Sequence, residues 1–267
     1  MKHHPFLLTA CVAMAMISAG PAETIPVRLP QRNVHRSMVT RSETGTVIAR
    51  HEFTQVVRGD EVTMHFAYYF TDGSLDDEVT TFTERGAVRL VRDHHVEKGP
   101  FFTKPVDYAI DFAAGTATIR TVDKTGKVNI ESRHLQLPGD LANGLIGVLL
   151  LNVPPDVKPF RVDMLAPVGG GRMIQIAISP EGEQSLQIAG RNVSATVFRI
   201  HPELGGIVGW IATLIGVEPK DVMVWVTEGK DPAVVKIVGQ LGGYGPVVTS
   251  CVEGIHFGNE TSAAQHP

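Results

Sequence analysis

The sequence predicts a mainly β fold: a single large, curved antiparallel sheet, either a half-barrel or an open barrel, with two short apolar helices. Three observations support this fold class. Apolar and polar residues alternate over many short segments, which is typical of strands with one buried face. Turn-forming residues separate these segments at short intervals, as in antiparallel meanders. Only two segments combine an apolar run with suitable helix ends, so helices are expected to be scarce.

The first residues predict a secretory signal peptide over residues 1–22. Lys2 precedes an apolar run at 6–17, and small residues follow that run up to Ala22, as is typical of such signals. A lipoprotein signal at Cys11 is the alternative, but few apolar residues precede this cysteine and the run after it stays apolar. Export predicts that the protein is periplasmic or secreted.

The rest of the chain is expected to form one folded unit. Residues 23–44 are polar, contain several arginines, and predict an N-terminal leader to the first strand. Residues 45–258 contain no long linker and no repeat of fixed length, which predicts a single β-rich domain. Residues 259–267 are expected to form a flexible C-terminal tail.

The clearest strand is EVTMHFAYYF at residues 61–70, where every second residue from Val62 to Phe70 is a large apolar residue. DYAIDF at 107–112 alternates in the same way. The last third contains the further expected strands GRMIQIAIS, EQSLQIAGRNVSATVFRI, DVMVWVTEG, AVVKIVGQL and GPVVTSCVEG, each bounded by glycine, proline or Glu-Gly signals. Turns are expected at Gly59, Gly73, Gly86 and Gly126, and at the glycines of PVGGGR.

The two expected helices cover residues 141–152 and 203–216. The second is apolar on several faces and carries a stripe of small residues at helical spacing, so another backbone could approach it closely. Fourteen residues of helix span only about 21 Å, whereas the hydrocarbon core of a bilayer is about 30 Å thick. We therefore expect no transmembrane segment after signal cleavage.

Charge and cysteine content limit the function classes. Without Lys2, which lies in the signal, the chain has 23 basic and 28 acidic residues. This mildly acidic balance argues against nucleic acid as a partner. Cys251 is the single cysteine after the signal, so it forms no intramolecular disulfide. Its valine-rich surroundings predict a buried strand position and argue against a catalytic thiol.

Motifs for catalysis, metal or cofactor binding are not found. Asp93, His94 and His95 form the densest histidine cluster, but adjacent strand residues point to opposite faces, so we interpret them as an exposed strand end. Asp76-Asp77-Glu78 follows a turn and is expected to be solvated. No phosphate-binding glycine loop and no nucleophile elbow is present. The sequence therefore predicts no catalytic residue, no metal site and no cofactor.

The last 80 or so residues resemble uncharacterised exported bacterial proteins of unknown function. The resemblance is carried by Ile188-Ala189-Gly190-Arg191, ELGG at 203–206, IGVEP at 215–219, Val224-Trp225-Val226, Asp231-Pro232-Ala233 and Gly245-Pro246-Val247. It implies no activity and no site residue. At the level of fold class, the expected architecture is also similar to the half-barrel of periplasmic lipoprotein carriers, in which acyl chains lie between a concave sheet and helices.

These features favour a non-enzymatic exported protein that binds a lipid or another apolar ligand between the sheet and the two helices. Two alternatives stay open: an enzyme with a site at strand ends, using residues such as His65 and Asp111, and a structural protein without a ligand. Ligand identity and oligomeric state do not follow from the sequence. The residues expected to line the ligand site are apolar or aromatic, namely Met64, Phe66, Tyr68, Phe70, Tyr108, Ile110, Phe112, Trp210 and Trp225.

Overall fold

The structure, a computed structural model, describes residues 24–122, 126–167, 171–203, 220–241, 245–253 and 255–256. The expected signal peptide at 1–22, the C-terminal tail at 259–267 and the second expected helix after residue 203 lie outside these residues. Within them, no helix is long and apolar enough to cross a membrane.

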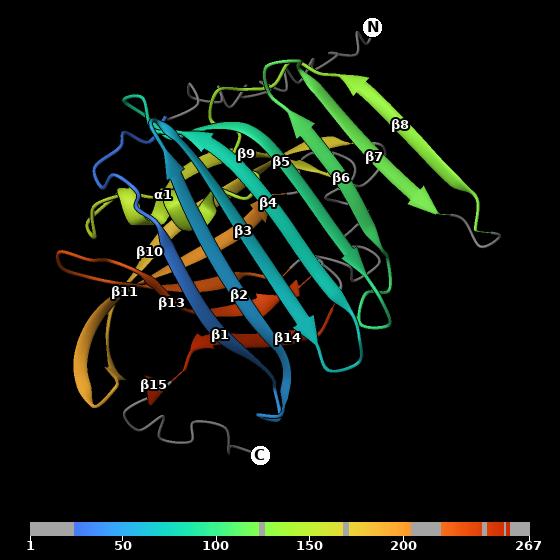
Figure 1. The fold of residues 1–267 in the computed structure, drawn as a ribbon. Coiled ribbons are helices and arrows are strands. Elements are labelled where there is room, and N and C mark those ends of the chain that lie inside the picture. Colours follow the sequence, from blue (N-terminus) through green and yellow to red (C-terminus); the bar gives the residue numbers. More distant parts are fainter. Residues whose placement is uncertain are drawn as a thin grey trace, which may run out of the picture.

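The described strands form one sheet of fifteen strands (Figure 1). They are β1 (Val34–Ser42), β2 (Val47–Arg58), β3 (Glu61–Phe70), β4 (Leu75–Thr83), β5 (Arg89–Lys98), β6 (Val106–Asp111), β7 (Thr116–Val122), β8 (Val128–His134), β9 (Phe160–Ala166), β10 (Arg172–Ile188), β11 (Arg191–Glu203), β12 (Val222–Thr227), β13 (Val234–Gln240), β14 (Val247–Val252) and β15 (Ile255–His256).

The order along the sheet is β15-β10-β11-β12-β13-β14-β1-β2-β3-β4-β5-β6-β7-β8, and β9 also pairs with β10. The pairing of β1 with β14 joins the first half of the chain to its last third. Within the described part, β8 pairs only with β7, so the sheet curves without closing into a barrel. The predicted fold class, mainly β with one large curved antiparallel sheet that forms a half-barrel or open barrel, is confirmed.

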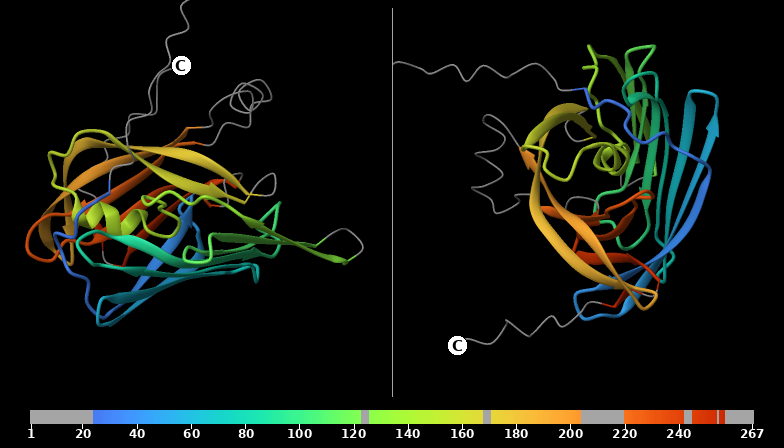
Figure 2. Two further views of the ribbon diagram at one scale, coloured as in Figure 1. Left: turned by 90° about the horizontal axis from the view of Figure 1, so that it is seen from above. Right: turned by 90° about the vertical axis from the view of Figure 1, so that its left-hand side faces the viewer.

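The single helix among the described residues, α1 (Ile146–Asn152), lies inside the curve of the sheet. Figure 2 shows it between the blue and green strands β1–β5 on one side and the yellow and orange strands β10 and β11 on the other. The main hydrophobic core joins α1 to the inner faces of both walls, for example through Leu149, Met64 and Ile178. The space between the walls is therefore where a site for a ligand can form.

The predicted alternation fixes the inner face of β3. Val62, Met64, Tyr68 and Phe70 are buried, whereas Tyr69 on the other face is 50% exposed. The neighbouring strands keep this register, because Phe66 is opposite Phe53 of β2 and opposite Glu78 of β4. Side chains at alternate positions of β2, β3 and β4 consequently face the same interior.

Helix α1 is shorter than the expected helix at 141–152 because the chain before it packs against the sheet in another conformation. Leu141 forms a parallel bridge with Asp163 of β9. Gly144 has a φ of +66°, and a Cβ there would lie 1.9 Å from Thr80 Oγ1. The side chain of Asn143 bonds to the backbone of Leu165 in both directions, at 2.8 and 2.9 Å. Helical geometry therefore starts only after this fixed turn.

The end of α1 is held by Asn152, which is 1% exposed. Its Oδ1 accepts hydrogen bonds from the backbone N–H groups of Arg28 and Leu29 at 2.8 and 2.9 Å, and its Nδ2 donates to the carbonyl of Val148 at 2.9 Å. This buried amide ties the N-terminal segment to the helix.

The expected boundary between a leader at 23–44 and the β domain is wrong, because part of this segment belongs to the sheet. Pro26 bridges to Ala87, and β1 pairs with both β2 and β14. The strand was not recognised because its polar residues conceal its alternation: His35 and Ser37 are exposed, while Met38 is buried. Strand β9 was not predicted either.

Cys251 lies in β14, as predicted for a strand residue, but it is only half-buried. Burial nevertheless raises the pKa of its thiol, and the nearby charges of Arg41 and Lys236 lower it by less. The expectation of a fully buried cysteine was therefore too strong.

Candidate ligand-binding cavity

A cavity of about 470 Å³ lies between the concave face of the sheet and α1. Small-molecule sites commonly measure about 300 to 1,000 Å³, so this volume is sufficient for a small ligand or part of a lipid. One wall comes from β1 to β5 and the other from β10 to β13, with α1 between them. Both halves of the sheet thus contribute to the same cavity.

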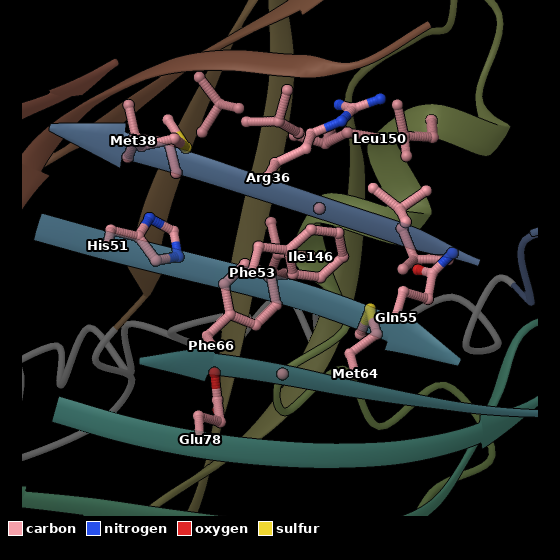
Figure 3. A pocket seen from close by; sticks show the side chains of 18 of the residues that line it. Arg36, Met38, His51, Phe53, Gln55, Met64, Phe66, Glu78, Ile146 and Leu150 are labelled. Atoms are coloured by element: carbon pink, nitrogen blue, oxygen red, sulfur yellow. The ribbon is translucent and has the colours of Figure 1, made fainter. Parts of the chain in front are cut away.

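Most of the lining is apolar. Figure 3 shows Phe53, Met64 and Phe66 of the first wall around the space that Ile146 and Leu150 of α1 also face. The opposite wall adds aliphatic side chains from four strands, namely Ile176, Ile200, Val222, Val224, Val234 and Ile237. An apolar surface of this kind favours ligands that bring apolar area of their own.

His51 is a polar exception within the apolar wall. It is 1% exposed, and neither ring nitrogen has a hydrogen-bond partner among the described residues. Its ring stacks on Tyr68 with 4.0 Å between ring centroids and lies 5.4 Å from the ring of Phe66. Burial lowers the pKa of His51 to about 4, so the ring is neutral near pH 7. It can offer one donor and one acceptor to a ligand.

The two arginines that line the cavity come from the segment at 32–36. Arg32 pairs with Asp231. Arg36 is half-buried, and both its burial and the charge of Arg32 lower the pKa of its guanidinium. Arg36 points toward Leu150 in Figure 3, which places a positive charge beside the apolar face of α1.

The cavity has an acidic wall formed by β4 and β5. In the antiparallel register, Asp76 is opposite Glu97, Glu78 is opposite His95, and Thr80 is opposite Asp93. All six side chains are at alternate positions and therefore share the inner face. Asp76, Asp93 and Glu97 are buried, with 7%, 1% and 4% exposure. Of this wall, Asp76, Glu78 and His95 line the cavity itself.

His95 lies at the centre of the acidic wall. Its Nε2 is 2.8 Å from Asp76 Oδ1 and 3.8 Å from Glu97 Oε1, while its Nδ1 is 3.9 Å from Glu78 Oε1. Burial by itself lowers the pKa of His95, but the hydrogen bond to Asp76 and the charges of Glu78, Asp76 and Glu97 raise it to about 10. His95 is thus a cation among carboxylates when no other cation is bound.

Three carboxyl groups of this wall, those of Glu78, Asp93 and Glu97, have a raised pKa and so bind protons more tightly than usual. Burial and the charge of Asp76 raise the pKa of Glu97 to about 7, although His95 opposes this shift. Burial raises the pKa of Glu78 as well, and the charge of Asp93 adds to the effect. The single positive charge of the His95 imidazolium does not balance the negative charges of all the carboxylates in this wall.

Three of these residues form a group with the spacing of metal ligands. The donor atoms of Asp76, His95 and Glu97 all lie within 4.8 Å of one another. One imidazole nitrogen with carboxylate oxygens is a donor set suited to Zn²⁺ and related divalent metals. The expectation that Asp76 to Glu78 are solvated is therefore wrong for Asp76 and Glu78, and the expectation of an exposed strand end at 93–95 is wrong for Asp93 and His95.

The structure separates the residues that the sequence analysis placed in one ligand site. Met64, Phe66 and Tyr68 line the cavity, and their role in binding stays a prediction. Phe70 instead packs against Phe101 and Phe102. The other predicted residues that do not line the cavity belong to or pack on the main core, namely Tyr108, Ile110 and Phe112.

The two tryptophans differ in what can be said of them. Trp210 lies outside the described residues. Trp225 is on the face of β12 opposite to the cavity: its Nε1 donates to Gln184 at 2.8 Å, and Lys236 Nζ lies 4.3 Å from its ring centroid. The prediction that Trp225 lines the site is wrong, because its neighbour Val224 occupies the inner face.

The strand-end residues suggested for an enzyme do not meet in this cavity. His65 pairs with Asp77 at 2.7 Å on the outer face, and Asp111 accepts a hydrogen bond from the backbone of Ala114 in a turn. Sequence reasoning missed the polar lining residues, namely Gln31, Arg32, Arg36, His51, Gln55, Asp76, Glu78 and His95. The members of this set that lie on β1, β2, β4 and β5 occupy the inward-facing positions of their strands, and the sequence alone does not reveal this without the register.

Comparisons with known proteins add little beyond this geometry. No family model matches the chain, and no curated protein sequence matches it. The chain is similar to the crystal structure of a β-barrel-like protein of domain of unknown function DUF1849 from Brucella abortus. The two share 10% identity with a TM-score of 0.46, over 86% of this chain and 99% of that chain.

Proposed function

We propose that this chain is an exported, non-enzymatic protein that binds a lipid or another apolar ligand in the cavity between the sheet and α1. The observation that supports the proposal best is the cavity itself, about 470 Å³ in volume and lined mainly by aliphatic and aromatic side chains from both walls. Apolar ligand area removed from water in such a space contributes about 25 cal/mol per Å².

The polar groups of the cavity limit the ligand to one with few polar atoms. His51 offers a neutral donor and acceptor inside the apolar wall, and Arg36 offers a positive charge near α1. Sites for small molecules commonly combine an apolar lining with a few polar groups that orient the ligand. A lipid with one small polar or anionic end meets both conditions.

Export is the second part of the proposal and rests on the sequence. The pattern of residues 1–22 is typical of a secretory signal. A soluble carrier outside the cytoplasm has to shield an apolar cargo from water, and the cavity supplies apolar walls for this purpose. N-terminal sequencing of the protein from an envelope fraction should give an N-terminus near residue 23.

The binding proposal is tested by titration with an apolar fluorescent probe and by native mass spectrometry before and after solvent extraction. Wild-type protein should bind the probe and carry an extractable mass. Ile146→Trp narrows the cavity and should weaken probe binding about tenfold or more. Val56→Trp, at a 45% exposed position on β2, is the matched control and should bind like wild type. A wild-type protein that binds no probe and carries no extractable mass would exclude a carrier role and favour a structural one.

A further inference from the structure

We infer that Asp76, His95 and Glu97 form a binding site for one divalent transition metal ion of the Zn²⁺ class, built into the acidic wall of the cavity. The proposal concerns these three side chains and does not depend on an apolar ligand. Metal binding and lipid binding are therefore independent: the failure of one proposal leaves the other standing.

The first argument is the arrangement of the donor atoms. His95 Nε2 faces both carboxylates, at 2.8 Å from Asp76 Oδ1 and 3.8 Å from Glu97 Oε1. Metal–ligand bonds of Zn²⁺ measure about 2.0 to 2.2 Å for imidazole nitrogen and carboxylate oxygen. The three donor atoms all lie within 4.8 Å of one another, so small movements of the side chains would bring them to one common ion.

The second argument is an unsatisfied acceptor. Glu97 is 4% exposed, and its Oε2 has no hydrogen-bond partner in the part of the chain that the structure describes. A buried carboxylate oxygen without a donor or a cation carries a large desolvation cost. A metal ion that lies between Glu97, Asp76 and His95 would remove this cost directly.

The third argument is the charge of the surroundings. Four inward-facing carboxylates, those of Asp76, Glu78, Asp93 and Glu97, lie on two adjacent strands with His95 as the imidazole among them. Buried charges are normally paired or bound to a metal. A divalent cation would neutralise the two negative charges of its own ligands, Asp76 and Glu97, whereas an imidazolium compensates only one.

The fourth argument is that His95 is oriented as a metal ligand should be. Its Nε2 faces the proposed ion, while its Nδ1 is 3.9 Å from Glu78 Oε1 and its ring contacts Tyr108 edge-on at 5.6 Å. Metal-bound histidines commonly direct their second nitrogen toward a carboxylate, which fixes the ring and increases its basicity.

The alternative is that His95, as an imidazolium, is the only cation of the wall. The full-length protein, freed of metal with a chelator, distinguishes the two. Titration with Zn²⁺ by calorimetry and with Co²⁺ by visible absorption should show one saturable ion per chain and a rise in melting temperature. No saturable binding to the folded wild type at millimolar metal would overturn the proposal.

Substitutions locate the ion. Asp76→Asn and Glu97→Gln keep the side-chain shape and should each weaken metal affinity about tenfold or more, and the double variant should abolish the Co²⁺ spectrum. Asp77→Asn and His65→Gln alter the equivalent pair on the outer face and should leave the affinity unchanged. If a variant folds poorly, the Co²⁺ absorption spectrum of the folded wild-type protein still tests whether a metal ion binds. Binding that persists in the double variant, or is lost in the outer-face controls, would place the ion elsewhere and refute the assignment.

Discussion

His95 Nε2 lies 2.8 Å from Asp76 Oδ1 on the inner face of the sheet, and the same kind of pair, His65 with Asp77 at 2.7 Å, lies on its outer face. Asp76 and Asp77 are consecutive residues of β4, so the alternation of the strand sends them to opposite sides. The inner pair is largely buried, whereas the side chains of the outer pair are 41% and 31% exposed. Two pairs of equal geometry therefore have different electrostatic surroundings.

We predict that His95→Gln destabilises the metal-free protein far more than His65→Gln does. Loss of His95 leaves buried carboxylates without a cation, and breaking a buried pair typically costs about 3 to 5 kcal/mol. Loss of His65 removes a partly exposed pair, and pairs near the surface contribute under about 1 kcal/mol. Urea unfolding in the presence of a chelator measures both changes. Equal losses in the two variants would mean that the inner carboxylates are protonated and need no partner.

His51 should make the protein less stable in mild acid. Its pKa is about 4 in the folded protein, whereas an unfolded histidine titrates near about 6.5. Between these values the unfolded chain binds the extra proton, so lowering the pH through this range reduces the free energy of unfolding by up to about 3 kcal/mol. His51→Phe keeps the stacking on Tyr68 and should remove this part of the pH dependence. The control His35→Gln, at an exposed site on β1, should retain the wild-type slope between pH 6.5 and 4.

Much of the fold could be predicted from the sequence because strand alternation fixes which residues share a face. This reasoning placed Met64, Phe66 and Tyr68 on one face of β3, and all three line the cavity. It did not find β1, whose inner face includes Arg36 and whose outer residues are also polar. Apolar alternation detects a strand only when the two faces differ in hydrophobicity.

The acidic wall could not be predicted because it depends on pairing between strands. Asp76 and Glu97 are far enough apart in sequence that only the register of β4 with β5 brings them opposite each other. Short-range reasoning treats each acidic run as solvated, which is the usual outcome. The prediction for Trp225 failed for a different reason. The alternation of β12 puts Val224 and Trp225 on opposite faces, and Val224 is the residue that lines the cavity.

Arg36 should distinguish ligands with an anionic end from neutral ones. Its half-buried guanidinium lines the cavity, and burial together with the charge of Arg32 disfavours its protonated form. A carboxylate ligand would relieve that repulsion, so Arg36→Gln should weaken binding of a fluorescent fatty acid about tenfold while changing the affinity for the matching alcohol little. Arg41→Gln, an exposed site on the same strand, is the control. An equal loss for acid and alcohol would show that Arg36 acts through packing.

Cys251 should react slowly with thiol reagents in the folded protein, although it is only half-buried. Burial raises the pKa of the thiol, which lowers the thiolate fraction at neutral pH. Labelling with a chromogenic disulfide should be several times slower than in the urea-unfolded chain, and the ratio should shrink as the pH rises. Labelling that is equally fast in both states would mean that β14 separates from its neighbours on the time scale of the reaction.

Gly144→Ala should be among the most damaging small substitutions in this chain, because it combines two separate penalties. A Cβ at this position would lie 1.9 Å from Thr80 Oγ1 and 3.0 Å from Asp93 Oδ1, and the backbone φ of +66° also disfavours a side chain. Gly59 has a φ of +64° with no atom within 4 Å of its Cβ position, so Gly59→Ala measures the backbone penalty alone. We expect about 1 to 2 kcal/mol for Gly59→Ala and about 2 to 5 kcal/mol for Gly144→Ala, since overpacking adds about 1 to 3 kcal/mol. Thermal and urea unfolding of the two variants measure the difference. If both variants lose the same stability, the turn before α1 moves away from β4 easily, and the contact between Gly144 and Thr80 does not fix the helix over the cavity.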